Sequence, residues 1–387
     1  MIITKENAPH LRRKPSVTRM MVDVLIARAP TLIFSFVVYP LNTLITLSIS
    51  LAIMILAEFV FVGLKNMMPK DGLKHSFKER FLYSYKGKYN QNNIITPAIT
   101  AVIYTLIMPA MPLNIPLTYV IIAVGAFAGI VFGKLVFGGL GSNIFNPAAV
   151  GMIFAKLCFG GAVIGGIKVW TATVPTWYYT IPDALAGATP LKLVNGPTLG
   201  NINNYDLLNL FLGRIPGTLG EVYKITIIIG MAYLLIRRSA DYRIVASYLG
   251  TFIVLMLIAG LAIFSMNNGV NPFTFLLYHL LSGGVLFGAA FMLTDPVTSP
   301  INGPSRIIYG MVAAVFTVLI RLFAALPEGV GFSILLANMV AVFLDHYEWS
   351  NPRYTWKKFL AMGLIVVLSG LTVFLVIRFG GEGVYHG

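Results

Sequence analysis

The chain has 387 residues, of which 57% are hydrophobic and 11% are charged, and its mean hydropathy is +0.81. A soluble domain has about 25% charged residues, so this composition excludes an ordinary water-soluble enzyme. The single cysteine, Cys158, excludes an internal disulfide and an iron–sulfur cluster held by this chain alone.

Long apolar runs recur along the chain, separated by short polar breaks. A helix of about 20 residues crosses the roughly 30 Å of hydrocarbon in a bilayer. We therefore predict an all-α polytopic membrane protein with about ten or eleven transmembrane helices. No signal peptide is expected, because the first run carries Asp23 and Arg28 and lacks a cleavage pattern. The expected spans are 22–39, 41–64, 95–110, 116–137, 147–169, 223–236, 243–265, 273–293, 306–325, 328–345 and 358–378.

The net charge of +14 is distributed unequally between alternate loops. Most of the 28 Lys and Arg residues fall before residue 22, between 65 and 88, at 237–243 and at 353–358, which lie on one side if the helices alternate. The positive-inside rule places that side in the cytoplasm. The chain is thus expected in the inner (cytoplasmic) membrane of a bacterial or archaeal cell, multi-pass, with a cytoplasmic N-terminus. No nucleic-acid partner is needed to explain the charge.

Proline-centred elements recur in the two halves and indicate an internal repeat. PAAVGMIFA at 147–155 parallels PEGVGFSIL at 327–335, and five expected spans separate the two copies. The copies would then have opposite orientations in the membrane, as in inverted-repeat transporters, although Pro and Gly are also frequent in unrelated membrane helices. The prediction is two inverted five-helix repeats, similar to the urea-transporter architecture. The segments would be 1–21 (cytoplasmic), 22–170 (first repeat), 171–221 (outward loop), 222–346 (second repeat) and 347–387 (connecting loop, final helix and tail).

Signals of soluble enzymes are absent from the sequence. GIVFGKL at 129–135 has the wrong spacing for a phosphate loop and lies in an apolar span. The five histidines show no paired spacing for a metal, and no Rossmann glycine pattern follows a strand. We predict no catalytic residue and no metal site in this chain alone.

The outward loop contains PDALAGATPL at 182–191. This segment resembles the D-x-x-S-G-A-T sequence at which a flavin transferase attaches FMN, through its phosphate, to the last threonine. Three further segments resemble signatures of the same family in the same order: VFGGLGSNIFNPAAVG, AFMLTDPVTSP and LPEGVGFSILLAN. The chain is identified as a member of the family that contains the B subunit of sodium-translocating NADH:quinone reductase and the D subunit of the Rnf ferredoxin:NAD oxidoreductase.

The resemblance implies a covalent flavin in the outward loop. Thr189 would be the acceptor of the FMN phosphoester, and Asp183, Gly187 and Ala188 would form the surrounding signal. Ala186 stands where the family pattern usually has Ser or Thr. Attachment through the phosphate would leave the ring free for electron transfer.

The resemblance also implies a second, non-covalent flavin, riboflavin, within the helices near the cytoplasmic side. Asn143 and Asn146 match positions that contact it, and their amides can donate to and accept from the polar edge of the ring. The alternative is that they satisfy broken-helix backbone around Pro147. Thr96 is a further candidate contact. Asp295 and Asp345 match acidic positions of the family and could form a cation path, or could be a turn residue and an interfacial residue respectively.

Other polar residues of the spans are given structural roles. Lysines near span ends, Lys134 among them, are expected to snorkel to the interface. Arg321 and Glu328 would form a pair on the outer side. Gly125, Gly129 and Gly133 would let helices approach closely.

The N-terminal segment APHLRRKPSVTRMMVDVLIARAP and the modest length of the chain are more similar to the Rnf D subunit than to the quinone reductase B subunit. The predicted function is electron transfer between the two flavins within a complex that exports Na⁺ or H⁺. The expected partners are the other Rnf subunits, including iron–sulfur and NAD-binding subunits, a flavin transferase for maturation, and the lipid bilayer. The alternatives are the B subunit of the quinone reductase and, in a different class, a small-solute channel of urea-transporter-like fold.

Overall fold

The computed structural model describes residues 17–65, 78, 79, 85, 89–164, 167–170, 177, 178, 206–266, 271–324, 329–346 and 351–379. Helices make up most of these residues, and one two-residue hairpin pairs Val163 with Lys168 and Ile164 with Ile167. The elements of the first half are α1 (Val17–Val38), α2 (Pro40–Lys65), α4 (Asn92–Ile107), α5 (Pro116–Ile130), the π-helical η1 (Val131–Leu135), α6 (Pro147–Phe159), β1 (Val163–Ile164) and β2 (Ile167–Lys168).

In the second half, the regular elements among the described residues are all helices. Its elements are α8 (Leu207–Leu212), α9 (Lys224–Ile236), α10 (Tyr242–Phe264), α11 (Pro272–Leu281), α12 (Val285–Phe287), the π-helical η4 (Gly288–Met292), α13 (Gly303–Phe323), α14 (Val330–Leu344) and α15 (Trp356–Phe379).

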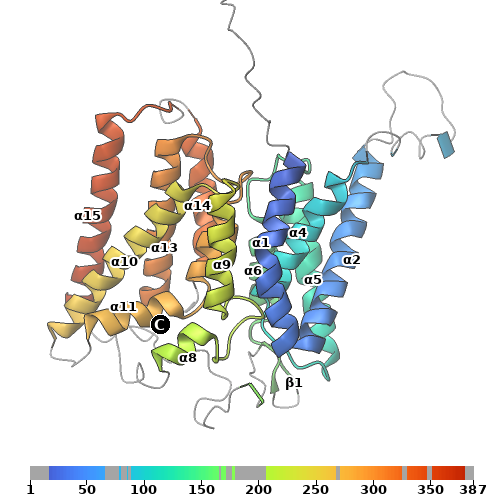
Figure 1. The fold of residues 1–387 in the computed structure, drawn as a ribbon, viewed down its shortest axis with the longest axis horizontal. Coiled ribbons are helices and arrows are strands. Elements are labelled where there is room, and N and C mark those ends of the chain that lie inside the picture. The colour runs from blue at the N-terminus through green and yellow to red at the C-terminus, as the bar shows by residue number, and fades with distance from the viewer. Residues whose placement is uncertain are drawn as a thin grey trace, which may run out of the picture.

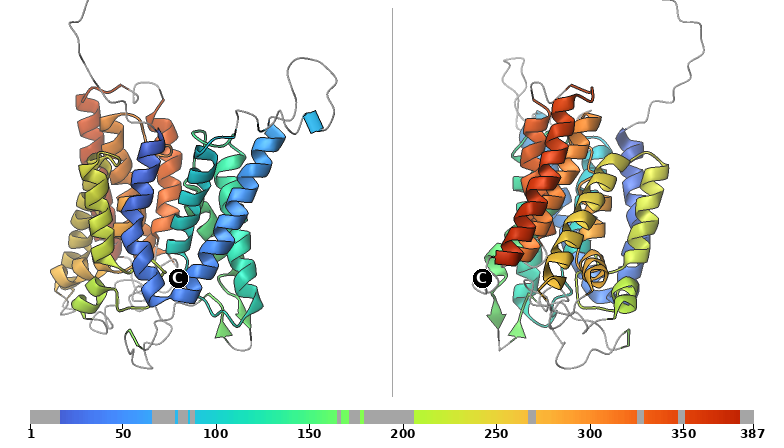
Figure 2. Two further views of the ribbon diagram at one scale, coloured as in Figure 1. Left: turned by 45° about the vertical axis from the view of Figure 1, so that its right-hand side comes forward. Right: turned by 90° about the vertical axis from the view of Figure 1, so that its left-hand side faces the viewer.

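The long helices stand side by side and run in alternating directions (Figures 1 and 2). We call the end at which α1 begins the upper end and the opposite end the lower end. In Figure 1, α2, α9 and α14 end at the upper end, whereas α4, α10 and α13 end at the lower end. This division agrees with the two sides expected from the basic residues.

Helix length confirms a polytopic all-α membrane protein but gives fewer full spans than expected. Six helices, namely α1, α2, α5 with η1, α10, α13 and α15, are long and apolar enough to cross a bilayer. The pair formed by α11 and α12–η4 would be a seventh, bent by 61°. The apolar helices α4, α6, α9 and α14 are shorter, and α6 ends at Phe159, ten residues before the expected end of its span.

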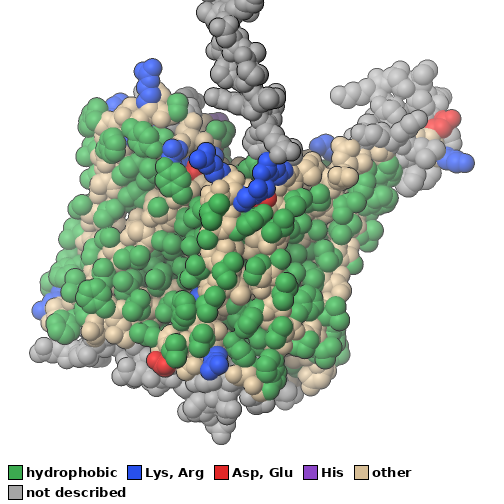
Figure 3. Space-filling model, in the orientation of Figure 1, with side chains coloured by type: hydrophobic (Ala, Val, Ile, Leu, Met, Phe, Trp, Pro, Cys, Tyr) green, Lys and Arg blue, Asp and Glu red, His purple; other side chains and the backbone are tan. Residues whose placement is uncertain are grey.

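The surface between the two ends is apolar, as a lipid-facing surface requires. Large hydrophobic side chains within the helices, such as Ile26, Leu56 and Val367, are exposed on it. Figure 3 shows a broad hydrophobic band over the helices, with many of the visible Lys and Arg side chains gathered at the upper end. Lipid chains rather than water would contact these apolar side chains.

Both halves of the chain contribute to the interior. Within the halves, α2 packs on α4, α5 on α6, and α10 on α13. Between the halves, α1 packs against α9 and α6 against α14. The cavity described below is lined by residues of both halves, from α1, α4 and α6 in the first and from α9 in the second.

Glycine allows α5 and α6 to approach closely, as expected. A Cβ atom at Gly129 would lie 2.7 Å from Pro147 O, and one at Gly133 would lie 2.6 Å from Pro147 Cα. Pro147 begins α6, and Asn146 caps it by accepting hydrogen bonds from Ala148 N (3.1 Å) and Ala149 N (3.3 Å).

The break between α11 and α12 is held by an arginine from α13. Arg321 is 2% exposed and donates from Nη1 to His279 O (2.6 Å) and from Nη2 to Ser282 O (3.3 Å). These bonds satisfy carbonyls that the break leaves outside the helical pattern. The expected partner of Arg321, Glu328, lies outside the described residues.

Candidate functional site

The predicted flavin-attachment site belongs to the part of the chain that the structure does not describe. Asp183, Gly187, Ala188 and Thr189 all lie outside the described residues. Their assignment therefore stays a prediction from the sequence.

A cavity of about 460 Å³ opens among α1, α4, η1, α6, α9 and the loop after η4, and we call it the inner cavity. Thr96, Asn143, Asn146 and Asp295 all line it. These four residues come from distant parts of the sequence, and the fold brings them together. The fifth, Asp345, lies elsewhere: it follows α14 and its Oδ1 accepts a hydrogen bond from Ile301 N (3.0 Å).

The two asparagines differ in how far the protein already uses their side chains. Asn146 is 1% exposed, and besides capping α6 it donates from Nδ2 to Met292 O (3.4 Å). Its backbone N–H donates to Asn338 Oδ1 (3.0 Å), which ties α6 to α14. Among the described residues, Asn143 makes one long side-chain bond, from Nδ2 to Phe145 O (3.3 Å). Asn143 is thus freer to bind a ligand, and the capping role expected as the alternative holds for Asn146.

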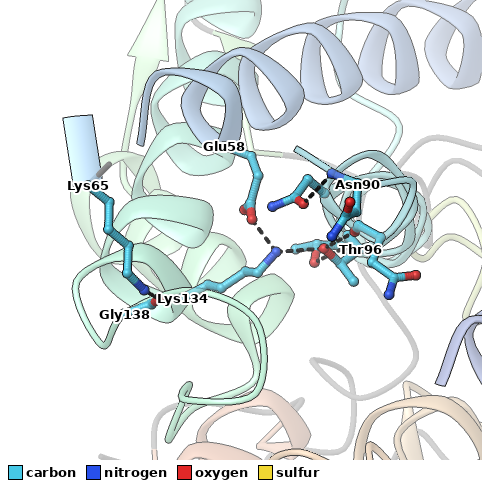
Figure 4. A network of polar contacts seen from close by, with 9 residues as sticks. Glu58, Lys65, Asn90, Thr96, Lys134 and Gly138 are labelled. Atoms are coloured by element: carbon cyan, nitrogen blue, oxygen red, sulfur yellow. Dashed lines mark hydrogen bonds and ion pairs between the residues drawn. The ribbon is translucent and has the colours of Figure 1, made fainter. Parts of the chain in front are cut away.

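An ion pair lies in the wall of the inner cavity (Figure 4). Lys134 Nζ, from η1, donates to Glu58 Oε2 of α2 (2.8 Å) and to Thr96 Oγ1 of α4 (2.7 Å). Both charged side chains are 2% exposed. The expectation that Lys134 snorkels is therefore wrong, because its ammonium is held inward by a carboxylate from another helix.

The Thr96 hydroxyl both accepts and donates a hydrogen bond within this network. It accepts from Lys134 and donates to Asn92 O (2.8 Å). Thr96 therefore positions Lys134 rather than offering its own hydroxyl hydrogen to a ligand. Nearby, Lys65 Nζ donates to Gly138 O (2.7 Å) and fastens α2 to the glycine-rich turn after η1 (Figure 4).

Arg28 of α1 is a second cation in the wall of the inner cavity. It is 3% exposed, and its Nη2 donates to Phe291 O (2.9 Å). Its guanidinium carbon lies 5.3 Å from the centroid of the Phe291 ring, at a distance suited to a cation–π contact. The sequence marks Arg28 only as a charge within an apolar run.

Asp295 supplies a carboxylate in the same wall. Its Oδ1 accepts from Val297 N (3.3 Å) and its Oδ2 accepts from Thr298 Oγ1 (3.3 Å). This pattern is that of a turn residue, which was one of its two expected roles. Asp295 also lines the cavity, so contact with a ligand or cation, its other expected role, stays a prediction.

A second cavity, of about 290 Å³, lies between α1, α8 and α9. We call it the outer pocket. Phe34, Tyr178 and Tyr223 line it, with Phe34 and Tyr223 in edge contact at 4.6 Å between ring centroids. The Tyr223 hydroxyl is buried and has no hydrogen-bond partner among the described residues. Arg214 also lines the pocket, and burial raises the pKa of Tyr178 while Arg214 opposes that shift.

Comparison with known proteins agrees with the motifs. The profile of the NQR2, RnfD, RnfE family matches residues 4–353. The B subunit of the Na⁺-translocating NADH-quinone reductase of Chromohalobacter salexigens is 39% identical over 253 residues, which cover 64% of this chain and 57% of that relative. The corresponding protein of Ectopseudomonas mendocina is 37% identical over 254 residues, 58% of its length.

A second kind of relative matches at lower identity over a greater length. The D subunit of the Na⁺-translocating ferredoxin:NAD⁺ oxidoreductase complex of Acetobacterium woodii is 28% identical over 347 residues, 89% of this chain and 93% of that relative. The matches to the two quinone reductase proteins span less than three fifths of their length, whereas the Acetobacterium protein is nearly coextensive with the chain. From the extent of the profile match, the chain belongs to the NQR2, RnfD, RnfE family.

Proposed function

We propose that this chain is the flavin-bearing D-type subunit of an ion-translocating ferredoxin:NAD⁺ oxidoreductase complex. The nearly coextensive match to the Acetobacterium woodii protein supports this branch. The higher identity to the quinone reductase proteins favours the second candidate, a B-type subunit of an NADH:quinone reductase. In either complex the chain would pass electrons between flavins, and partner subunits would bind the nicotinamide and the iron–sulfur centres.

The observation that carries the proposal is the composition of the inner cavity. Its volume of about 460 Å³ falls in the usual range of about 300–1,000 Å³ for small-molecule sites. Ile99, Ile103, Leu234 and Phe291 supply apolar walls for a flat ring. Asn143 supplies an amide at one side for a polar ring edge. These residues fit a flavin, and we assign riboflavin to this cavity.

The chain's own residues would bind and orient that flavin. Asn143 would exchange hydrogen bonds with the polar edge of the ring, and Asn146 would fix the turn on which Asn143 sits by capping α6. Lys134, held by Glu58 and Thr96, would present a fixed positive charge to the cavity. The bound flavin would supply the capacity to accept and release electrons.

The second flavin of the proposal is FMN on Thr189, in the outward loop. Tyr178 and Asp206 are the described residues on either side of the long stretch that contains Thr189, and Tyr178 lines the outer pocket. The aromatic lining of this pocket and the cation Arg214 suit a flavin ring. With FMN attached to Thr189 on this side, the two flavins would lie toward opposite faces of the membrane.

The orientation and the repeat are also part of the proposal. The upper end would face the cytoplasm, in the inner membrane of a bacterium or archaeon, and α1–α6 and α9–α14 would form two inverted repeats. The pairing of α1 with α9 and of α6 with α14 supports this, because equivalent helices meet about a pseudo-two-fold axis in such folds. Electron flow would drive Na⁺ or H⁺ outward, with Asp295 a candidate for a cation path.

Flavin content tests the proposal directly. The full chain, coexpressed with a flavin transferase and purified in lipid nanodiscs, should contain one acid-extractable riboflavin and one covalent FMN. The covalent FMN should remain as a fluorescent band after denaturing electrophoresis. A chain that carries neither flavin from cells with an active transferase would refute the proposal and favour the channel alternative.

A further inference from the structure

The guanidinium of Arg28 is only partly bonded within the protein. Nη2 donates to Phe291 O, but Nε and Nη1 are buried and have no hydrogen-bond partner among the described residues. A buried N–H group left unpaired destabilises the fold, and a charged one does so more strongly. Arg28 lines the inner cavity, and a ligand there would pair with these enclosed donors once the guanidinium turns toward it.

No carboxylate of the described residues neutralises Arg28 directly. Glu58 is committed to Lys134. Asp295 lines the same cavity, but its oxygens accept from Val297 and Thr298, and the ion pairs seen among the described residues do not include Arg28. The positive charge of Arg28 thus has no carboxylate in direct contact among the described residues. A hydrogen-bond acceptor or a negative charge on a ligand would supply the missing partner.

We propose that Arg28 binds the polar edge of the flavin in the inner cavity and makes this cavity bind reduced flavin more tightly than oxidised flavin. This inference rests on the proposed function. The pyrimidine edge of a flavin offers carbonyl and ring-nitrogen acceptors. When an external reductant supplies two electrons, the ring takes up one proton from water and retains one negative charge along that edge.

A cation at a fixed position in a low-dielectric cavity stabilises that new charge. The oxidised ring gains only hydrogen bonds from the same guanidinium, so Arg28 stabilises bound reduced flavin more than bound oxidised flavin. Arg28 should therefore raise the reduction potential of the inner flavin. An arginine that served only to offset Asp295 would affect the binding of both forms alike.

The test uses the full-length chain with Thr189→Val, so that riboflavin is the one flavin that reports. The protein is loaded with riboflavin in nanodiscs, and its midpoint potential is measured from the absorbance spectrum during dithionite titration with reference dyes. Fluorescence titration gives the dissociation constant of oxidised riboflavin. The variants are Arg28→Met and Arg28→Lys. The matched control is Arg237→Gln, which removes an arginine that is paired with Asp23 and does not line the cavity.

Arg28→Met should lower the preference for reduced over oxidised flavin at least tenfold, which is about 30 mV toward more negative potential for a two-electron couple. Arg28→Lys should retain most of the preference, and Arg237→Gln should leave the potential unchanged. If Arg28→Met does not fold, the comparison of Arg28→Lys with Arg28→Gln decides the same question. A midpoint potential that is the same in the charged and neutral variants overturns the role of Arg28. Wild-type protein that binds no riboflavin refutes the inner flavin itself, which is a different result.

Discussion

Lys134 Nζ lies 2.8 Å from Glu58 Oε2, and both side chains are 2% exposed. The two residues come from η1 and α2, and their pairing fixes one wall of the inner cavity. Removing either charge leaves the other buried without compensation, so the pair stabilises the packing of these two elements.

The first prediction concerns this pair. Glu58→Met should lower the free energy of unfolding by about 3–5 kcal/mol, because it leaves the Lys134 ammonium buried and unpaired. The double variant Glu58→Met, Lys134→Met should recover most of that loss, since both charges are then absent. Scanning fluorimetry of the purified proteins measures the effect. A double variant that is no more stable than Glu58→Met would show that the ion pair is not the source of the stability.

The second prediction concerns Asn143 and Asn146. Asn143→Leu should weaken binding of riboflavin about tenfold, by loss of one or two hydrogen bonds of about 1 kcal/mol each, without changing stability. Asn146→Leu should in addition destabilise the protein by about 1 kcal/mol, because α6 loses its cap. Acid extraction and fluorescence titration give the first quantity and thermal unfolding the second. Both variants should keep the covalent fluorescent band, and wild-type riboflavin content in Asn143→Leu would remove this residue from the site.

The third prediction concerns covalent FMN. Thr189→Val should abolish the mass increase of FMN minus water on the peptide that contains residue 189, because valine has no hydroxyl to esterify. Thr198→Val, a threonine in the same loop, is the matched control and should leave the modification intact. Ala186→Ser should modify at least as completely as the wild type. An unmodified wild-type peptide from cells with an active transferase would contradict the assignment.

The fourth prediction concerns orientation. In a Cys158→Ser background, a cysteine at Asn203 should react with an impermeant maleimide added to intact cells or spheroplasts. A cysteine at Lys78 should react only after the membrane is permeabilised, because the basic segment around it is expected in the cytoplasm. The reverse pattern would invert the topology and place the covalent flavin on the opposite side.

The sequence predicts the helices well because apolar runs long enough to span a bilayer are local features. Each of the eleven expected spans overlaps a described helix or, for 273–293, a bent helix pair, although α6 is shorter than its expected range because the chain turns after Phe159 and forms β1 and β2. The number of full spans was harder to predict, since α4, α6, α9 and α14 are apolar but short. Hydropathy alone does not separate a short helix inside a protein from one that crosses the membrane.

The sequence predicts the inner cavity only in part. The family resemblance points to Asn143, Asn146 and Asp295, and the proline-centred element at Pro97 points to Thr96; the fold brings the four residues to one cavity. The network in which Thr96 takes part could not be predicted, because Glu58 and Lys134 lie 76 residues apart and meet only through the packing of α2 on α5.

The roles of Arg28 and Lys134 were not predicted either. A lone charge in an apolar run has the same local sequence whether it faces lipid, snorkels or enters a cavity. Its direction depends on the rotation of its helix against neighbours, and in the case of Lys134 on a π-helical turn that ends α5.

The bonds from Arg321 to the end of α11, just before the break, also determine how this half of the protein can move. A bend of 61° would ordinarily be a hinge, because its backbone carbonyls are free to change partners. Here one guanidinium from α13 holds the carbonyls of His279 and Ser282, on either side of the last residue of α11. We therefore expect α11 and α13 to move as one rigid unit during any conformational cycle, with bending confined to the break that follows Ser282 and to the connections that flank the pair.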